Sequence, residues 1–185
     1  MQFFDGGVCF PKGFTAHGVL AGIKKGRTQE DVALIVSEKQ CSASGVLTKN
    51  LVQAEPVKLS KKHLESRRSY AVIANSGNAN ACTGKQGEEN ALLMASCTAQ
   101  ALQKKGMTGV CTGDVLVCST GVIGQQLAVE KIEAKIDELV AGLSKEGNVK
   151  ARQAIMTTDT VHKECAVQTV IGGKDVRLGT MAKGS

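Results

Sequence analysis

The stretch Val115-Leu116-Val117-Cys118-Ser119-Thr120-Gly121-Val122-Ile123-Gly124 decides how this chain is expected to fold. Its apolar first half is typical of a buried strand, and the Ser-Thr-Gly that follows is typical of a turn. Gly121 can take a positive φ, so its N–H and the Thr120 hydroxyl can face the same external point. Two such donors at the end of a strand suit an anion. The alternative is an ordinary strand-to-helix loop with a hydroxyl cap.

A second unusual loop is expected upstream of this stretch, after another apolar strand. Tyr70–Ala74 predicts that strand, and the sequence NSGNANACTG follows it at 75–84. Asn and Ser side chains compete for backbone hydrogen bonds, and Asn tolerates left-handed conformations. The loop is therefore either a self-capped surface turn or the amide-lined wall of a pocket. The wall residues would be Asn75, Ser76, Asn78 and Asn80.

The rest of the hydrophobic pattern mixes strands with helices, which predicts an α/β fold. Helices are expected over 58–67, 88–105, 129–141 and 149–155. Strands are expected over 18–23, 31–36, 43–48, 164–171 and 175–178, with turns at 24–27 and at Gly172-Gly173. The final residues, 179–185, complete no element, so the chain is expected to continue beyond Ser185.

Composition favours a single globular domain over residues 1–185, with 42% hydrophobic and 22% charged residues. Aromatic residues make up only 3%, so the core should be aliphatic, and base-stacking platforms are disfavoured. The net charge is +6, but basic residues cluster only at 58–68, where Leu and Glu interrupt them. A solvated basic face is therefore expected, and no nucleic-acid partner. A positive field would still concentrate an anionic substrate.

Other classes of protein are disfavoured by what the sequence lacks. It has no apolar run long enough to cross a membrane and no signal-peptide pattern at its N-terminus, which predicts a cytoplasmic protein without a membrane partner. Seven cysteines without a CxxC pair predict reduced, mostly buried thiols. The three histidines are dispersed, so no metal is expected. Asp114 is expected to be a turn residue and not a general base.

Hydroxyl and amide groups are left as the candidate chemistry. They occur in four segments, at 75–80, 119–121, 157–160 and 183–185, three of which follow apolar elements. Such groups can donate to an oxyanion and fix a substrate, but they include no activated nucleophile. The nucleophile is therefore expected to lie outside this sequence.

Seven segments, taken in order, resemble the ornithine acetyltransferase (glutamate N-acetyltransferase) family of arginine biosynthesis, and specifically its α chain. The longest and most specific are Asn75–Gly84 and Ser119–Gly124. The others are Pro11–Phe14, Gly18 with Gly22–Lys24, Ala33–Ile35, Met156–Thr160 and Met181–Ser185. One departure is His162, where the family commonly has proline, and this change concerns loop stiffness more than chemistry.

The resemblance implies an α/β unit with stacked β-sheets between helix layers, the fold of self-processing acyltransferases that use an N-terminal threonine. The family's precursor cuts itself shortly after the position of Lys183, and the new threonine that begins the β chain is the nucleophile. Thr120 and Gly121 match the family's oxyanion-hole pair. Thr157 and Lys183 match its substrate-binding threonine and lysine on the α chain.

The implied reaction moves acetyl from N-acetylornithine to glutamate through an acetyl-threonine on the β chain. No cofactor is required, although some family members also accept acetyl-CoA as an acetyl donor. The implied partner is the β chain of the same precursor, in an α2β2 heterotetramer. Two alternatives stay open: a self-cleaving relative that acts as an amidohydrolase or aminopeptidase, and a non-catalytic module that binds a small ligand.

Overall fold

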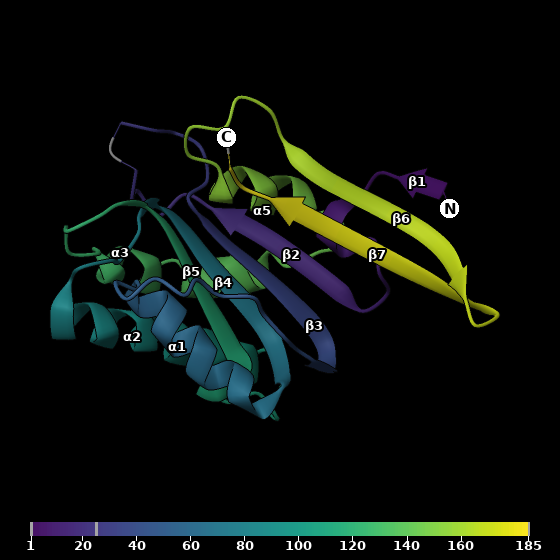
Figure 1. Cartoon of the computed structure of the whole chain (residues 1–185), viewed down its shortest axis with the longest axis horizontal. Helices are drawn as coiled ribbons and strands as arrows, with labels where there is room; N and C mark the ends of the chain where they lie inside the picture. Colours follow the sequence, from purple (N-terminus) through teal and green to yellow (C-terminus); the bar gives the residue numbers. More distant parts are fainter. Residues whose placement is uncertain (1, 25, 185) are drawn as a thin grey trace.

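The computed structural model describes residues 2–24 and 26–184 and has two β-sheets with helices packed on them, which confirms the predicted α/β fold (Figure 1). One sheet has four strands in the order β2-β3-β4-β5, and the other has three in the order β1-β6-β7. Lys25, in the predicted turn at 24–27, and Ser185, at the end of the last matching segment, lie outside the described residues.

The four-stranded sheet carries the stretch from which the prediction began. Its strands are β2 (Phe14–Val19), β3 (Val32–Ser42), β4 (Arg68–Asn78) and β5 (Val115–Val122). The first three pair antiparallel, whereas β5 pairs parallel to β4. A parallel pair needs a long crossover, and helix α2 (Gly84–Lys104) provides it. The carboxyl ends of β4 and β5 therefore lie side by side at one edge of the molecule (Figure 1).

One face of this sheet is covered by α1 (Glu55–His63), α2, α3 (Val129–Glu133) and α4 (Ile136–Ala141). The core on this face is aliphatic, as composition predicted, because alternate residues of β3, β4 and β5 point into it. Its fully buried side chains include Leu34, Ile73, Val117, Leu102 and Leu139.

The other face is covered by α5 (Asn148–Ile155), which lies between the two sheets. Small residues let this helix approach closely: Ala33, Ala74 and Ala151 form its buried contact. At Gly18 a Cβ atom would overlap the backbone of Lys150. On its far side, α5 reaches the second sheet through an ion pair between Arg152 and Glu164.

The second sheet consists of β1 (Gln2–Phe4), β6 (Lys163–Ile171) and β7 (Lys174–Ala182). β6 and β7 form a hairpin whose turn is Gly172-Gly173, with φ of 58° and 76°. Two positive φ values at the central positions match the twist of the flanking strands, and glycine adopts them without strain. The predicted hairpin is therefore confirmed, with a longer return strand than predicted. β7 delivers the final residues back towards α5 (Figure 1).

Several predicted boundaries were wrong in the first half of the chain. No strand forms over 43–48, where the described residues lie in an exposed irregular segment and Val46 is 102% exposed. The Val and Leu residues there favour a strand, but a strand needs a neighbour to pair with. The first long strand is Phe14–Val19 instead of 18–23, and α1 begins at Glu55, ahead of the predicted 58–67, with Pro56 in its first turn.

Other predicted boundaries differ from those observed in β4 and in the helices that follow it. β4 continues to Asn78, so the first four residues of the predicted loop at 75–84 belong to a strand. α2 begins at Gly84, one turn before the predicted residue 88. The predicted helix 129–141 is broken at Ala134 and Lys135 into α3 and α4, whereas α5 matches its prediction closely.

All seven cysteines are free, as predicted, but only Cys9 is buried, so the prediction of mostly buried thiols was wrong. Within the described residues, no helix is long and apolar enough to cross a membrane.

Candidate active site

A cavity of about 800 Å³ opens where β4 and β5 end, and all four residues matched to the family's functional positions line it. These are Thr120, Gly121, Thr157 and Lys183, from three different segments of the chain. Its other lining residues come mainly from the loop before β3 and from the segment between β5 and α3, and they are Gly22, Ile23, Lys24, Arg27, Gly77, Asn78, Val122, Gln125, Gln126, Ala128, Lys131 and Thr158.

The end of β5 supplies the first pair. Thr120 lies opposite Ser76 and Gly121 opposite Gly77 in the parallel register. Gly121 has φ of 140°, which confirms the predicted positive value. A Cβ atom on Gly121 would overlap the backbone of Gly77 and Asn78, so two requirements fix glycine here. The predicted turn at Ser-Thr-Gly was wrong, because these residues stay within β5 and pair with β4, but the positive φ of Gly121 was placed correctly.

The amides expected to line the pocket lie mostly behind its wall. Asn75, Ser76 and Asn80 are each at most 1% exposed, and only Asn78 of the four contributes to the lining. Asn75 Oδ1 accepts a hydrogen bond from Ser119 Oγ at 2.5 Å, while its Nδ2 donates to the Asn78 carbonyl at 2.9 Å. We therefore correct the predicted wall to Asn78 alone. Its amide is also engaged inside the protein, because Nδ2 donates to the Gln125 carbonyl at 3.1 Å and Oδ1 accepts the Asn80 N–H at 2.7 Å.

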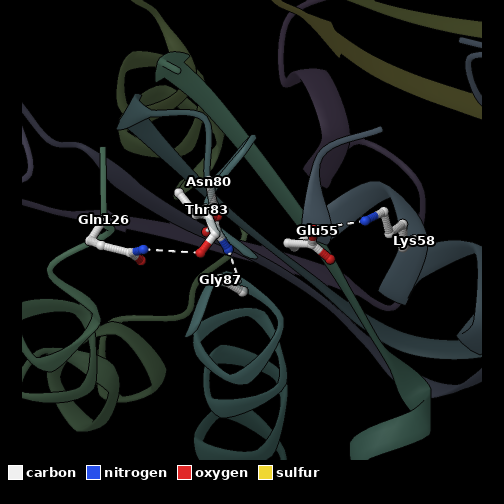
Figure 2. Close-up of polar contacts among 6 residues, drawn as sticks. All are labelled: Glu55, Lys58, Asn80, Thr83, Gly87 and Gln126. Carbon is white, nitrogen blue, oxygen red and sulfur yellow. Dashed lines mark hydrogen bonds and ion pairs between the residues drawn. The ribbon is translucent and has the colours of Figure 1, made fainter. Parts of the chain in front are cut away.

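Asn80 fixes the start of α2 (Figure 2). Its Nδ2 donates to the Gly87 carbonyl at 2.8 Å, and its Oδ1 accepts from Thr83 Oγ1 at 2.7 Å. Gln126 Nε2 then donates to the Thr83 carbonyl at 2.9 Å, which connects this turn to the cavity lining. Glu55, which forms an ion pair with Lys58 at 2.8 Å, donates its backbone N–H to the Asn80 carbonyl. The segment 75–84, here called the asparagine loop, is thus a scaffold that holds β5 and α2 in place.

A buried carboxylate, Asp31, fixes the loop before β3 that forms one wall of the cavity. The sequence analysis did not identify this residue. Asp31 is 0% exposed and accepts backbone N–H groups from Ala21, Ile23 and Lys24 at 2.6, 2.6 and 3.1 Å. Lys24 lines the cavity, and its Nζ donates to the Met156 carbonyl at 2.6 Å. Burial lowers the pKa of this ammonium, and the charge of Asp31 opposes the shift.

A second carboxylate, also missed, stands behind Thr157 and Lys183. Asp159 accepts the Thr157 N–H at 3.2 Å, the Gly184 N–H at 2.8 Å and Lys163 Nζ at 2.8 Å. These donors hold the pKa of the Asp159 carboxyl well below its usual range, with Lys163 the largest cause. The sequence offered no standard turn signal for it, because Asp159 accepts the N–H two residues before it, the reverse of an Asx turn.

The lining is cationic. It contains Lys24, Arg27, Lys131 and Lys183, and within residues 2–24 and 26–184 no carboxylate lines it. Lys24 and Lys131 are partly engaged, because Lys131 Nζ donates to the Gly22 carbonyl at 3.0 Å. An excess of positive charge beside hydroxyl donors suits an anionic ligand such as a carboxylate.

Other groups that were considered for chemistry lie elsewhere. Asp114 accepts from the Cys111 N–H at 2.9 Å and from Gln40 Nε2 at 3.0 Å, which confirms it as a turn residue. No Ser, Cys or His lines the cavity in the described part of the chain. Among the described residues, no cluster of three His, Cys, Asp or Glu is positioned to hold a metal ion.

Fold and site together define an α/β chain with a cationic, hydroxyl-bearing cavity at its parallel strand ends, a lining that suits a small anion. The family model described as the ArgJ family matches residues 15–185, and the chain belongs to that family.

Curated relatives are similar over the full length of the chain. The arginine biosynthesis bifunctional protein ArgJ of Gloeobacter violaceus is 48% identical over 186 residues, and that of Symbiobacterium thermophilum 47%. These alignments cover 100% of this chain but 44% and 45% of the relatives, so the chain spans less than half of their length.

Solved structures are similar over nearly their whole chains. Ornithine acetyltransferase from Mycobacterium tuberculosis, crystallised with ornithine, matches with a TM-score of 0.93 and 39% identity, covering 100% of this chain and 95% of that one. The Bacillus halodurans ArgJ structure matches with a TM-score of 0.89 and 37% identity, covering 100% and 93%. The expected fold with stacked sheets is confirmed by these likenesses.

Proposed function

We propose that this chain is the α half of a self-cleaved acetyltransferase that moves acetyl from N-acetylornithine to glutamate. The observation that carries the proposal is that Thr120, Gly121, Thr157 and Lys183 line one cavity, although they come from three separate segments. Membership of the ArgJ family supports the same activity. The ornithine bound to the M. tuberculosis relative is the kind of amino acid that this cavity would hold.

The residues of this chain would bind the substrate and stabilise its charge. The Lys183 ammonium would pair with the substrate carboxylate, and the Thr157 hydroxyl would complete that site. Thr120 and the Gly121 N–H would donate to the oxyanion that forms when the acetyl carbonyl is attacked. The cationic lining would favour the carboxylates of both N-acetylornithine and glutamate.

The nucleophile would be a threonine that begins a second chain made from the same precursor. The chain spans 44% of one relative but 95% of a solved chain, which supports a protein made of two parts. The threonine Oγ would attack the acetyl carbonyl, and its own amine would take the hydroxyl proton. The amide C–N bond would then break, and ornithine would leave with the proton on its amine.

The second half-reaction would restore the enzyme. The amine of glutamate would attack the acetyl-threonine ester, the C–O bond would break, and N-acetylglutamate would leave while the threonine hydroxyl regained its proton. No cofactor enters either step, and acetyl-CoA would act only as an alternative acetyl donor. The protein would work in the cytoplasm as an α2β2 assembly of the two chains.

Steady-state kinetics of the whole gene product test this proposal. With N-acetylornithine and glutamate both varied, a ping-pong enzyme gives parallel lines in double-reciprocal plots and releases equal amounts of ornithine and N-acetylglutamate. Release of acetate without N-acetylglutamate would instead assign the protein to the hydrolases. Binding of ornithine without any turnover would make it a binding module.

A further inference from the structure

The two residues matched to substrate binding lie in segments that are distant in sequence. Thr157 follows α5, whereas Lys183 follows β7 after the whole β6–β7 hairpin. Both side chains must reach one carboxylate for the proposed function to hold. Some feature of the fold therefore has to set the distance between these two segments.

Asp159 contacts the backbone beside both of them. Its Oδ2 accepts the N–H of Thr157 at 3.2 Å, and its Oδ1 accepts the N–H of Gly184, the residue after Lys183, at 2.8 Å. Lys163 Nζ, from the start of β6, donates to Oδ1 at 2.8 Å. One carboxylate thus joins three segments of the chain.

The surroundings of Asp159 show that it acts from behind the cavity. Its side chain is 1% exposed, and it is not among the lining residues. A carboxylate with three donors on its two oxygens is well satisfied, and charge-assisted bonds of this kind are the strong ones. Asp159 is therefore placed to hold its neighbours without touching a ligand.

The Thr157 segment is also held from the opposite side. Lys24 Nζ donates to the Met156 carbonyl at 2.6 Å, and the Lys24 backbone is in turn bound by the buried Asp31. The residue before Thr157 and the N–H of Thr157 itself are thus both fixed. The Lys183 segment is held on one side by the pairing of Ala182 with Lys163, and on the other by the bond from Gly184 to Asp159.

We propose that Asp159 is a positioning residue that sets the spacing of Thr157 and Lys183 for one substrate carboxylate. This inference rests on the proposed function and deepens it, because it names what aligns the carboxylate site. It differs from a role in stability alone. A stabilising contact would change the amount of folded enzyme, whereas a positioning contact changes how tightly the folded enzyme binds carboxylate substrates.

The test compares Asp159→Asn with Lys163→Met in the full-length, self-cleaved protein. In Asp159→Asn an NH₂ group replaces one of the two carboxylate oxygens, and this group cannot accept a hydrogen bond. Either the Thr157 N–H or the Gly184 N–H should therefore lose its acceptor. Lys163→Met removes the ion pair but leaves both backbone N–H bonds to Asp159.

Because the carboxylate would be bound equally in the ground and transition states, we expect Asp159→Asn to raise KM for both N-acetylornithine and glutamate by about tenfold or more, with kcat changed far less. Lys163→Met should leave both KM values close to those of the unaltered enzyme. An unchanged KM in Asp159→Asn, with only a lower melting temperature or fewer active molecules, would overturn the inference. So would an equal rise in KM in both variants.

Two further measurements keep the inference separate from the proposed function. The Kd of ornithine, measured by calorimetry, does not depend on turnover. If acetyl transfer is absent but Asp159→Asn still weakens ornithine binding, the proposed function fails and the positioning role stands. If transfer occurs and the KM and Kd of the variant are unchanged, the proposed function stands and the positioning role fails.

Amide hydrogen exchange tests the contacts in the unaltered protein, in case Asp159→Asn does not fold. The Thr157 and Gly184 amides should exchange slowly, because both are bonded to a buried carboxylate. Exchange of the Gly184 amide at the rate of an unstructured chain would overturn the inference without any variant.

Discussion

Gly121 lies directly opposite Gly77 in the parallel pair of β4 and β5, so close that a Cβ atom on Gly121 would overlap the Gly77 backbone. A Cβ atom on Gly77 would in turn lie 2.8 Å from Lys24 Cγ. Strands β4 and β5 and the loop before β3 that contains Lys24 thus meet at Gly77 and Gly121, which both line the cavity. The position of the Thr120 and Gly121 donors depends on this contact.

The first prediction concerns Gly121→Ala, with Gly124→Ala as its control. Both glycines have positive φ, of 140° and 76°, but a Cβ on Gly124 would meet nothing within 4 Å. Gly124→Ala should therefore cost only about 1–2 kcal/mol of backbone strain and keep its activity. Gly121→Ala should also push β5 away from β4 and lose acetyl transfer by about 10²-fold or more. Equal activity in the two variants would contradict the close approach.

The second prediction concerns the Thr120 hydroxyl. Thr120→Ala should lower kcat by about 10²–10³, the usual loss when one oxyanion donor is removed, and should also slow self-cleavage. The melting temperature should change little, because Thr120 is only half-buried. Thr108→Ala, which alters an exposed threonine outside the cavity lining, is the matched control and should turn over normally. Unchanged turnover in Thr120→Ala would exclude the oxyanion role.

The third prediction concerns Asn75, which we place in the scaffold and not in the wall. Asn75→Ala would leave the Ser119 hydroxyl and the Asn78 carbonyl without their partner. Buried groups left unpaired cost about 1–3 kcal/mol each, so the free energy of unfolding in urea should fall by that order. Asn50→Ala, at an exposed position, should change it by less than about 0.5 kcal/mol. Equal stability of the two variants would argue that Asn75 serves the ligand.

The fourth prediction concerns pH and Asp159. Its hydrogen bonds hold the pKa of the folded carboxyl below the value of about 3.9 expected in the unfolded chain. The charged form therefore stabilises the fold fully above about pH 4, and this contribution is lost as the pH falls towards the folded pKa. The melting temperature of the unaltered protein should exceed that of Asp159→Asn at pH 7, and the gap should shrink below about pH 4. A gap that is the same at pH 7 and pH 3 would contradict this account.

Sequence alone located the cavity best where the signal was local. The Ser-Thr-Gly after an apolar run predicted a turn with an unusual backbone. These residues instead stay in β5, but Gly121 does have a positive φ. The asparagine loop was also recognised as unusual. Its sequence did not tell whether the amides face a ligand or the interior, because this depends on distant partners such as Ser119 and Gln125.

Some of the missed contacts join residues far apart in the chain, whereas Asp31 binds amides only 7–10 residues away. Asp159 is bonded to Gly184, 25 residues away, and Lys24 to Met156, 132 residues away. Periodicity cannot predict such contacts, because they arise only when the hairpin and α5 are packed. The false strand at 43–48 has the same origin, since β-propensity without a pairing partner leaves a chain irregular.

The central claim is that this chain is half of a self-cleaved acetyltransferase. Intact mass and N-terminal analysis of the whole gene product, before and after brief exposure to N-acetylornithine, tests it most directly. We predict two chains, the second beginning with threonine and gaining one acetyl group on exposure. A single uncut chain, or a cut protein whose second chain never gains acetyl, would contradict the claim.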